Sequence, residues 1–356
     1  MSPHGRLTHR SNPFRFPAAV AVLAGLAIAF VACQPAGSGS AGSSAPVAPS
    51  AGSSAPSGSP VASAPGEVVQ LSIATGGTGG VYYPLGGGIA QVIRDNVPGY
   101  DATVQETNAS VDNMLLIASG GADLAFSLGD TAADAVAGKA DFEGKAVTAC
   151  AIGRLYNNFT QVVTSADTGI TSIEGLRGKR VSLGSPGSGT EVIALRILEA
   201  AGIDPDGDIK RAQLGIAETV DALKDGTIDV GFWSGGLPTG ALVDLATTGK
   251  MVLIPTGEYT AALQGRYGES YIEDAIPAGA YEGQAADVPT IVVPNVLVAN
   301  ISMATDLQQQ ITAAIYDNKA DLVAVHKAAG ELDPSTAGEV GFMDVCPGSA
   351  AYFAER

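Results

Sequence analysis

Two glycine-rich loops in this chain carry residue types that can hold a small anion. The first is Leu71-Ser-Ile-Ala-Thr-Gly-Gly-Thr-Gly-Gly-Val-Tyr-Tyr83, where an apolar strand leads into glycines and two tyrosines before an apolar helical run. Glycine lets the backbone approach a ligand closely, and a helix start offers unpaired N–H groups and the positive end of the helix dipole. The loop therefore predicts a site where backbone amides hold a carboxylate, with tyrosine rings and hydroxyls beside it.

The same design occurs a second time. The segment Val181-Ser-Leu-Gly-Ser-Pro-Gly-Ser-Gly-Thr190 also connects a strand to an apolar helix, and each unit is followed by a strand, a helix and a Gly-x-x-Asp turn, at residues 120–123 and 226–229. Strands that alternate with helices indicate parallel sheets with right-handed crossovers. We expect an α/β fold with two similar lobes, whose loops face each other across a cleft that binds a small molecule.

The candidate ligand-binding residues lie in these loops and at the strand and helix ends that follow them. They are Thr75, Gly77, Thr78, Gly79, Gly80, Val81, Tyr82, Tyr83, Asn108, Ser110, Asp130, Tyr156, Ser185, Ser188, Gly189, Thr190, Glu191 and Trp233.

Most of these candidates have a second interpretation. The loops could be tight strand–helix turns that need glycine only for its backbone freedom. Asn108 and Ser110 either bind the ligand or cap a helix, and Asp130 either accepts from an amine of the ligand or acts as a cap. Tyr156 and Trp233 either face the cleft or pack in the core.

The order of the elements predicts the lobe boundaries. Lobe I is expected to contain residues 67–158 together with 291–356, and lobe II residues 159–290. The chain then crosses between the lobes twice, near residues 155–160 and 285–300, and these crossings would form a hinge.

Three segments near these crossings have strong patterns. Residues 146–153 and 160–164 are each expected to form a strand, and the apolar residues 289–299 carry the chain back to lobe I. Residues 306–328 are expected to form one long amphipathic helix that packs on lobe I.

The residues needed for catalysis are scarce. After the first 32 residues the chain has one histidine, His326, which lies far from both loops, and neither loop contains Gly-x-Ser-x-Gly or Gly-x-Gly-x-x-Gly. The acidic segment 204–208 resembles a calcium loop but lacks the glycine and glutamate that complete one. We therefore expect a binding protein and not an enzyme, with no cofactor and no metal.

The N-terminal segment predicts export. Residues 1–32 combine three arginines with an apolar run that is too short to span a bilayer comfortably, as in a signal peptide. The run ends in Phe30-Val-Ala-Cys33, which resembles the lipobox of bacterial lipoproteins and implies cleavage before Cys33 and lipidation of that cysteine. Cleavage without lipidation is the alternative. Residues 33–66 are rich in Ser, Ala, Gly and Pro and uncharged, so we expect a flexible linker.

The composition excludes one class of partner. Of the 356 residues, 46% are hydrophobic and 15% charged, which allows two domains with buried cores. Removal of residues 1–32 removes three arginines and no acid, so the formal net charge of −17 becomes −20. A chain this acidic lacks the basic surface that nucleic acid requires.

Two cysteines remain apart from Cys33. An exported chain can keep a disulfide, so we expect a bridge between Cys150 and Cys346 that ties the C-terminal segment to lobe I. Two buried thiols are the alternative.

Several motifs in order resemble one family. Thr75 to Tyr83, residues 178–190, Ile276-Pro-Ala-Gly-Ala-Tyr281 and the ending Cys346-Pro-Gly-Ser-Ala-Ala-Tyr-Phe-Ala-Glu355 are similar to the TAXI family, the extracytoplasmic solute receptors of tripartite ATP-independent (TRAP) transporters. The resemblance covers about residues 68–356. Two positions depart from it. The family's ending usually has His where Cys346 stands, and its Leu-Tyr-Pro-Glu pattern is Leu155-Tyr-Asn-Asn158 here.

The resemblance implies a type II periplasmic-binding-protein fold, two-lobed and parallel-rich, with a hinge of crossover strands. It also implies a function: capture of a glutamate-, glutamine- or 2-oxoglutarate-like carboxylate and its delivery to a TRAP-type membrane permease. Such a receptor would lie in the periplasm or be anchored to the outer face of the cytoplasmic membrane. An exported enzyme or a sensory ligand-binding domain on the same fold is the alternative function.

Overall fold

A computed structural model describes residues 68–356, which belong to one compact unit. The expected signal peptide, the lipidation site at Cys33 and the linker lie outside the described residues. Within residues 68–356, no helix is both long and apolar enough to cross a membrane.

The strands form one ten-stranded sheet with the order β2-β1-β3-β10-β4-β7-β5-β6, to which β8 and β9 are added beside β4 and β10. The strands are β1 Val69–Ala74, β2 Tyr100–Gln105, β3 Leu124–Leu128, β4 Ala149–Ser165, β5 Arg180–Ser182, β6 Lys210–Ala212, β7 Val230–Gly235, β8 Met251–Ile254, β9 Ile272–Ile276 and β10 Val288–Asn300. The helices are α1 Tyr82–Asn96, α2 Ser110–Ser119, α3 Gly129–Ala137, α4 Gly189–Ala200, α5 Ile216–Lys224, α6 Gly240–Ala246, α7 Thr260–Tyr267, α8 Thr305–Asp317, α9 Lys319–Val325 and α10 Pro347–Ala354.

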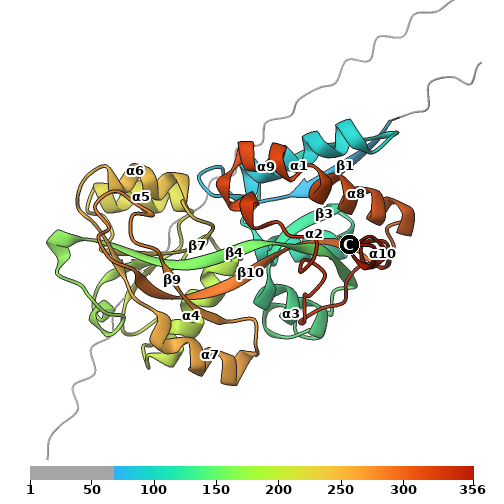
Figure 1. The fold of residues 1–356 in the computed structure, drawn as a ribbon. Coiled ribbons are helices and arrows are strands. Elements are labelled where there is room, and N and C mark those ends of the chain that lie inside the picture. Colours follow the sequence, from blue (N-terminus) through green and yellow to red (C-terminus); the bar gives the residue numbers. More distant parts are fainter. Residues whose placement is uncertain (1–67) are drawn as a thin grey trace, which may run out of the picture. The chain divides into compact units, whose positions relative to one another are not determined.

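The two ends of the sheet have the same arrangement. At one end β1 pairs in parallel with β2 and β3, and at the other β5 pairs in parallel with β6 and β7. Figure 1 shows α1, α8, α9 and α3 around the first group and α4 to α7 around the second. The repeated strand–loop–helix units in the sequence therefore occupy equivalent places at the two ends.

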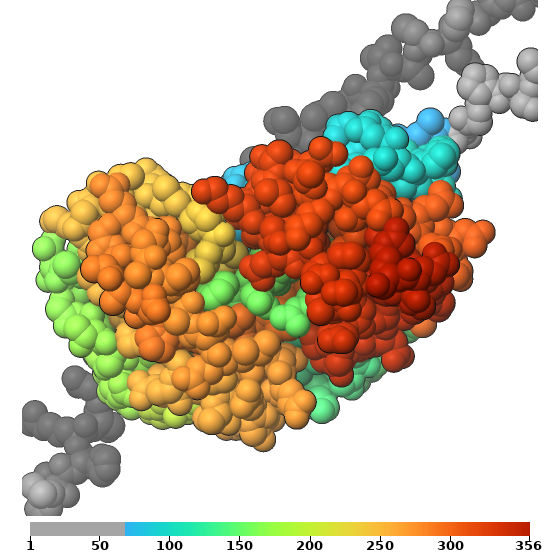
Figure 2. All heavy atoms as spheres, viewed as in Figure 1, coloured from blue at the N-terminus to red at the C-terminus, as the bar shows by residue number. Residues whose placement is uncertain are grey.

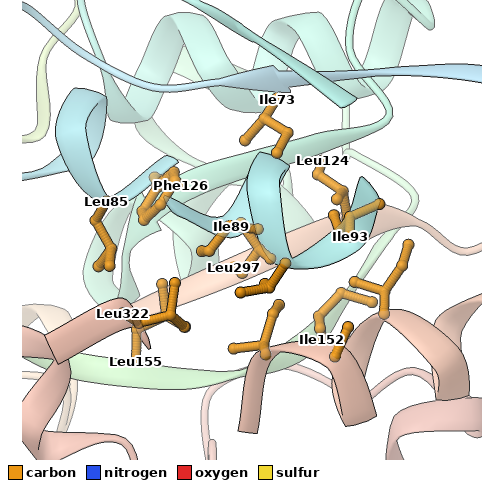
Figure 3. Close-up of a cluster of buried hydrophobic side chains, with 14 of the residues drawn as sticks. Ile73, Leu85, Ile89, Ile93, Leu124, Phe126, Ile152, Leu155, Leu297 and Leu322 are labelled. Carbon is orange, nitrogen blue, oxygen red and sulfur yellow. The ribbon is translucent and has the colours of Figure 1, made fainter. Parts of the chain in front are cut away.

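Separate hydrophobic cores support the two ends. In the first, the α1 residues Leu85, Ile89 and Ile93 recur every four positions, so they share one face of the helix, and all three are fully buried. Figure 3 shows them packed toward Ile73 and Phe126 of the sheet, with Leu322 nearby. In the second, side chains of α4 pack on β5 and β7 in a different cluster. Each end therefore buries its own apolar face.

Two long strands run through both ends. The expected strands at 146–153 and 160–164 are one strand, β4, of 17 residues. It continues without a break because its backbone pairs with β10 along its first part and with β7 along its second. Antiparallel pairing joins β4 to β10 over most of their length, with an irregularity after Pro294, which has no N–H to donate. The two sheets that the sequence predicts are therefore a single sheet, joined by antiparallel strands at its centre (Figure 1).

The expected long helix at 306–328 is also different. It is divided into α8 and α9 at Asn318, followed by a 3₁₀ turn at residues 327–331. The Asn318 side chain donates to the carbonyl of Ala314 at 2.8 Å. Asparagine competes with the backbone for such bonds, which favours an interruption of the helix.

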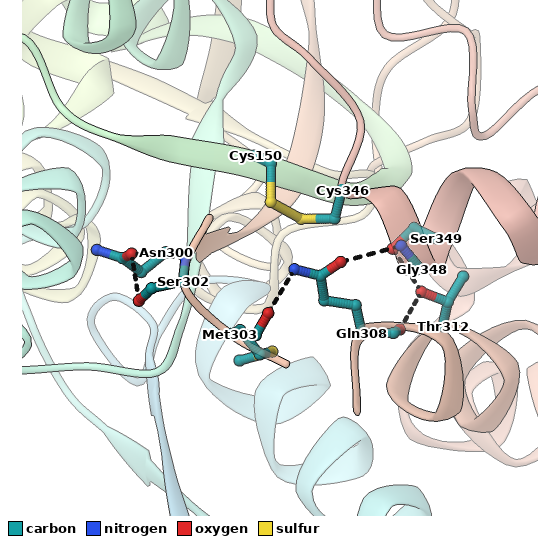
Figure 4. The surroundings of a disulfide bond; sticks show 9 residues. All are labelled: Cys150, Asn300, Ser302, Met303, Gln308, Thr312, Cys346, Gly348 and Ser349. Atoms are coloured by element: carbon teal, nitrogen blue, oxygen red, sulfur yellow. Dashed lines mark hydrogen bonds between the residues drawn. A yellow bond between two sulfur atoms is a disulfide. The ribbon is translucent and has the colours of Figure 1, made fainter. Parts of the chain in front are cut away.

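The C-terminal segment is tied to β4 by a disulfide between Cys150 and Cys346, with 4.9 Å between their Cα atoms. Figure 4 shows Thr312 and Ser349 hydrogen-bonded beside it, at 2.7 Å, which joins α8 to α10. In Figure 2 the last residues, in red, cover the part of the molecule that contains α1. The end of the chain is therefore part of the first core.

Candidate ligand-binding site

A cavity lies where the glycine loops of the two ends of the sheet meet. Its volume is ≈ 50 Å³, and its walls come from the loop before α1, the start of α2, the loop before α4, the middle of β4 and the end of β7. A wider groove of ≈ 900 Å³ lies next to it and shares Gly77, Asn108, Ser185 and Ile216 with the cavity. The cavity is thus the inner end of one cleft.

The structure brings most of the expected site residues to this cleft. The inner cavity is lined by Gly77, Gly80, Val81, Tyr82, Asn108, Ser110, Tyr156, Ser185, Ser188, Gly189, Thr190 and Trp233. Thr78 and Gly79 line the outer groove instead.

Four expected residues do not line either part of the cleft. Thr75 is fully buried and its hydroxyl donates to the carbonyl of Gln105 at 2.7 Å, while Tyr83, on the first turn of α1, is absent from both linings. Glu191 accepts from the amide of Gly187 and from Arg211. Its carboxylate therefore stabilises the second glycine loop from behind.

Asp130, expected either to accept from an amine of the ligand or to act as a cap, is the fourth of these residues, and it has partners within the protein. Its carboxylate lies 3.3 Å from the guanidinium of Arg196 and accepts from the hydroxyl of Tyr271 at 2.7 Å. Burial raises the pKa of Asp130, and the charge of Arg196 opposes that shift. The helix-start pattern around residue 130 contains no sign of Arg196, which is distant in sequence.

The start of α4 presents backbone donors to the cavity. Ser188 caps this helix by accepting from the amide of Glu191 at 3.1 Å, while Gly189 and Thr190 line the cavity. The first amides of an α-helix have no partner within the helix, and the dipole there favours negative charge. The start of α1, in contrast to that of α4, has no side-chain cap. Both helix starts can therefore receive an anion.

The cavity also contains polar side chains without partners. Among the described residues that line the cavity, the Tyr156 hydroxyl, the Asn158 carbonyl and the Ser234 hydroxyl are buried and have no hydrogen bond. Burial raises the pKa of Tyr82 and Tyr156 well above the usual value for tyrosine, so both hydroxyls are neutral. Buried polar groups in proteins are normally paired, so this concentration indicates a place for a ligand.

Three polar residues near the cavity were not predicted from the sequence: Asn158, Ser234 and Asn295. Asn158 and Asn295 lie within β4 and β10, and Ser234 lies in β7. Asn158 and Ser234 reach the cavity, and Asn295 contacts the hydroxyl of the lining residue Tyr82. They come together because β10, β4 and β7 are adjacent in the sheet, which local sequence does not reveal. The only signal was that two asparagines interrupt otherwise apolar strand patterns.

The two sides of the cleft touch each other directly. The carbonyl of Gly187 accepts from the amides of Val111 and Asp112 at 3.1 and 3.3 Å, at the start of α2. At Gly189, a Cβ atom would lie only 2.5 Å from a methyl carbon of Leu128. The structure is therefore a closed arrangement in which glycine permits the contact.

Known proteins share this architecture. The alignment with PhnD1 from Prochlorococcus marinus, solved in complex with methylphosphonate, covers 73% of this chain and 90% of that one, with 11% identity and a TM-score of 0.50. The alkanesulfonate-binding protein SsuA from Xanthomonas axonopodis pv. citri aligns over 81% of this chain and 84% of its own, with 15% identity and a TM-score of 0.46. The expected two-lobed fold of type II periplasmic binding proteins is confirmed.

A family model identifies the chain more directly than these distant structures. The model of the NMT1-like family matches residues 73–356, which include both glycine loops, the long strands β4 and β10 and the C-terminal disulfide. The chain therefore belongs to the NMT1-like family.

Proposed function

We propose that this protein is an extracytoplasmic solute-binding receptor of the TAXI type, which captures a small carboxylate between its lobes and delivers it to a TRAP-type permease. The observation that carries the proposal is the convergence of both glycine loops on one enclosed cavity whose neutral polar atoms lack partners. The ordered motifs that resemble the TAXI family support the same assignment.

The chemistry of the cavity favours a carboxylate. Its potential donors are the first amides of α4, the hydroxyls of Ser110 and Ser234 and the tyrosine hydroxyls. A carboxylate accepts several such bonds at once and benefits from the helix dipole. The acidic net charge of the protein acts only weakly at this distance because salt screens it within about 10 Å.

We propose the lobe boundaries and the location on the same basis. Lobe I would contain residues 67–158 and 291–356, and lobe II residues 159–290, with β4 and β10 as the hinge. Lipidation at Cys33 would hold the receptor at the membrane surface through its linker.

The TRAP-type partner is proposed from the motifs that resemble the TAXI family. Uptake by vesicles that contain either a TRAP or an ABC permease from the same genome, with the receptor added, separates the two.

Ligand identification tests the function itself. Native mass spectrometry of the purified protein, followed by calorimetry with carboxylates, amino acids, sugars and polyamines, should show tight binding of a carboxylate without turnover. Conversion of the bound compound would favour the alternative, an enzyme on the same fold. Tight binding of a sugar or a polyamine with carboxylates silent would overturn the proposal.

Small-angle scattering tests the hinge. A receptor that closes on its ligand should become more compact when a carboxylate is added. A profile that stays unchanged at saturating ligand would contradict closure.

A further inference from the structure

The inner end of the cavity has a cluster of neutral polar groups, which we call the amide floor: Tyr82, Tyr156 and Asn158 line the cavity, and Asn295 contacts the Tyr82 hydroxyl. All four side chains are buried, and the Asn158 amide donates to the Tyr82 hydroxyl at 3.4 Å. The Tyr82 hydroxyl also contacts Ser110 and Asn295. The amide floor therefore has both donors and acceptors available for a ligand.

The floor belongs to the strands β4 and β10. Asn158 and Asn295 lie on these two paired strands and both contact the Tyr82 hydroxyl, so they are close together although the register of the pair shifts between Pro294 and Val296. The Asn158 nitrogen donates to the Tyr82 hydroxyl, whereas its carbonyl has no partner within residues 68–356. That carbonyl can accept from a hydroxyl or an amide of a ligand.

The charges around the cavity are distributed unevenly. None of the residues that line the inner cavity has an ionisable carboxylate or a basic side chain. The two buried carboxylates among the described residues are already engaged: Asp130 with Arg196 and Glu191 with Arg211. A ligand carboxylate can be held by the helix starts, whereas a ligand ammonium would lose its water without gaining an anion.

We propose that Asn158 is a specificity-determining residue, which selects a carboxylate whose second polar group is uncharged, such as a keto or hydroxyl group, and excludes an ammonium at that position. This inference rests on the proposed function of the same cavity. It narrows the expected ligands to 2-oxo and 2-hydroxy acids and excludes the amino acids of equal length.

The test compares ligands that differ in one group. Calorimetry with 2-oxoglutarate, 2-hydroxyglutarate and L-glutamate keeps both carboxylates and the chain length and varies only the group at carbon 2. We expect the first two to bind at least about tenfold more tightly than glutamate, because an unpaired buried charge costs more than one hydrogen bond gains. Tighter binding of glutamate to the natural protein would overturn the inference.

Two variants with the same added charge sharpen the test. Asn158→Glu should shift the ratio of glutamate to 2-oxoglutarate affinity toward glutamate by at least about tenfold. Asn157→Glu is the matched control, because Asn157 does not line the cavity and its side chain accepts from Arg154 at 2.7 Å. Asn295→Asp adds the charge from the other strand and keeps the test decisive if Asn158→Glu folds poorly, which circular dichroism reveals.

The outcomes separate this inference from the proposed function. If carboxylates bind but glutamate is preferred, or if the Asn157→Glu control shifts the ratio equally, the amide floor does not determine specificity while the receptor function remains. If no carboxylate in the panel binds at all, both the proposed function and this inference fail.

Discussion

The lobes meet at two buried places with opposite chemistry. Behind the cleft, Arg196 of α4 contacts the carboxylates of Asp130 and Asp134 on α3, and the Tyr271 hydroxyl joins the cluster. Tyr267 places its ring 4.2 Å from the same guanidinium. In this cluster each charge has a partner, whereas the cavity contains no charge and several polar atoms without partners.

The comparison distinguishes buried polar groups that stabilise the fold from buried polar groups that can bind a ligand. A buried charge without a partner is so costly that a folded protein rarely keeps one, so the ion cluster is complete in the protein alone. Neutral polar atoms without partners cost less and are tolerated where a ligand completes them. The ion cluster therefore stabilises the closed arrangement, and the cavity is where a partner from outside is needed.

Removal of Arg196 should have the largest effect. Arg196→Ala leaves the buried carboxylate of Asp130 and the half-buried carboxylate of Asp134 without a cation, so we expect the free energy of unfolding to fall by about 3–5 kcal/mol. Urea denaturation measures it. Lys250→Ala is the control, because its pair with Asp167 is exposed and should be worth about 0–1 kcal/mol. Equal losses in the two variants would contradict the distinction between buried and exposed pairs.

A methyl group at the cleft should have the next largest effect. Gly189→Ala places a Cβ against Leu128, so closure should cost about 1–3 kcal/mol and ligand affinity should fall accordingly. Calorimetry with the tightest-binding carboxylate measures the loss. Gly265→Ala in α7 is the matched control, since a Cβ there meets no atom within 4 Å and affinity should not change. Unchanged affinity in Gly189→Ala would mean that binding does not require this contact.

Removal of a tyrosine hydroxyl should change the stability of the protein in opposite directions at a hydroxyl without a partner and at a paired one. Tyr156→Phe removes a hydroxyl without a partner, so the ligand-free protein should become more stable by about 1 kcal/mol, while ligand affinity falls. Tyr316→Phe removes a hydroxyl that donates to the carbonyl of Arg154 at 2.6 Å, so it should lose about 1 kcal/mol and keep its affinity. Thermal unfolding with and without ligand measures both. A loss of stability in both variants would show that Tyr156 has a partner within the protein.

The smallest effect is expected at the repeated Gly-x-x-Asp turns. Asp229 accepts from the amide and side chain of Arg180, and this hydrogen bonding lowers the pKa of its carboxyl group. The stabilisation is therefore complete above the ordinary aspartate pKa and is lost as the pH falls through the lower folded value. Asp229→Asn should remove this acid-side dependence and about 0.5–1 kcal/mol of stability near neutral pH.

The same turn provides its own comparison in the other lobe. Asp123 accepts from the amide and hydroxyl of Ser72 at 2.7 and 3.0 Å, so it joins β3 to β1 as Asp229 joins β7 to β5. Asp123→Asn should lose a similar amount of stability near neutral pH, measured by urea unfolding. Acid-side pH dependence that persists in Asp229→Asn, followed by urea unfolding between about pH 3 and 7, would show that other carboxylates cause it.

Local patterns predicted the features that depend on neighbours in sequence. The glycine loops, the helices that follow them and the turn aspartates are encoded within a few residues each, and the structure contains them at equivalent places in the two lobes. The binding roles of the loop residues stay predictions. The fold class followed from the alternation of strands and helices and from the resemblance.

Long-range pairing explains what the sequence did not reveal. Asn158 and Asn295 are 137 positions apart and meet only because β4 and β10 pair in the sheet. The residues around Asp130 suggested only a cap or a ligand acceptor. Its partner Arg196 could not be predicted, because that residue lies in the other glycine-loop unit, 66 positions away in the sequence. Residues 149–165 were expected as two strands, since local apolar content does not show that one strand crosses both lobes.

The Cys150–Cys346 bond determines how the chain responds to proteolytic cleavage. The bond spans 196 positions, and the loop it closes contains every residue of lobe II as proposed. A single proteolytic cut anywhere in that lobe therefore opens the loop without releasing a fragment, and the two pieces separate only after reduction. Damage to the surface of lobe II in an oxidising compartment would leave the receptor in one covalent piece.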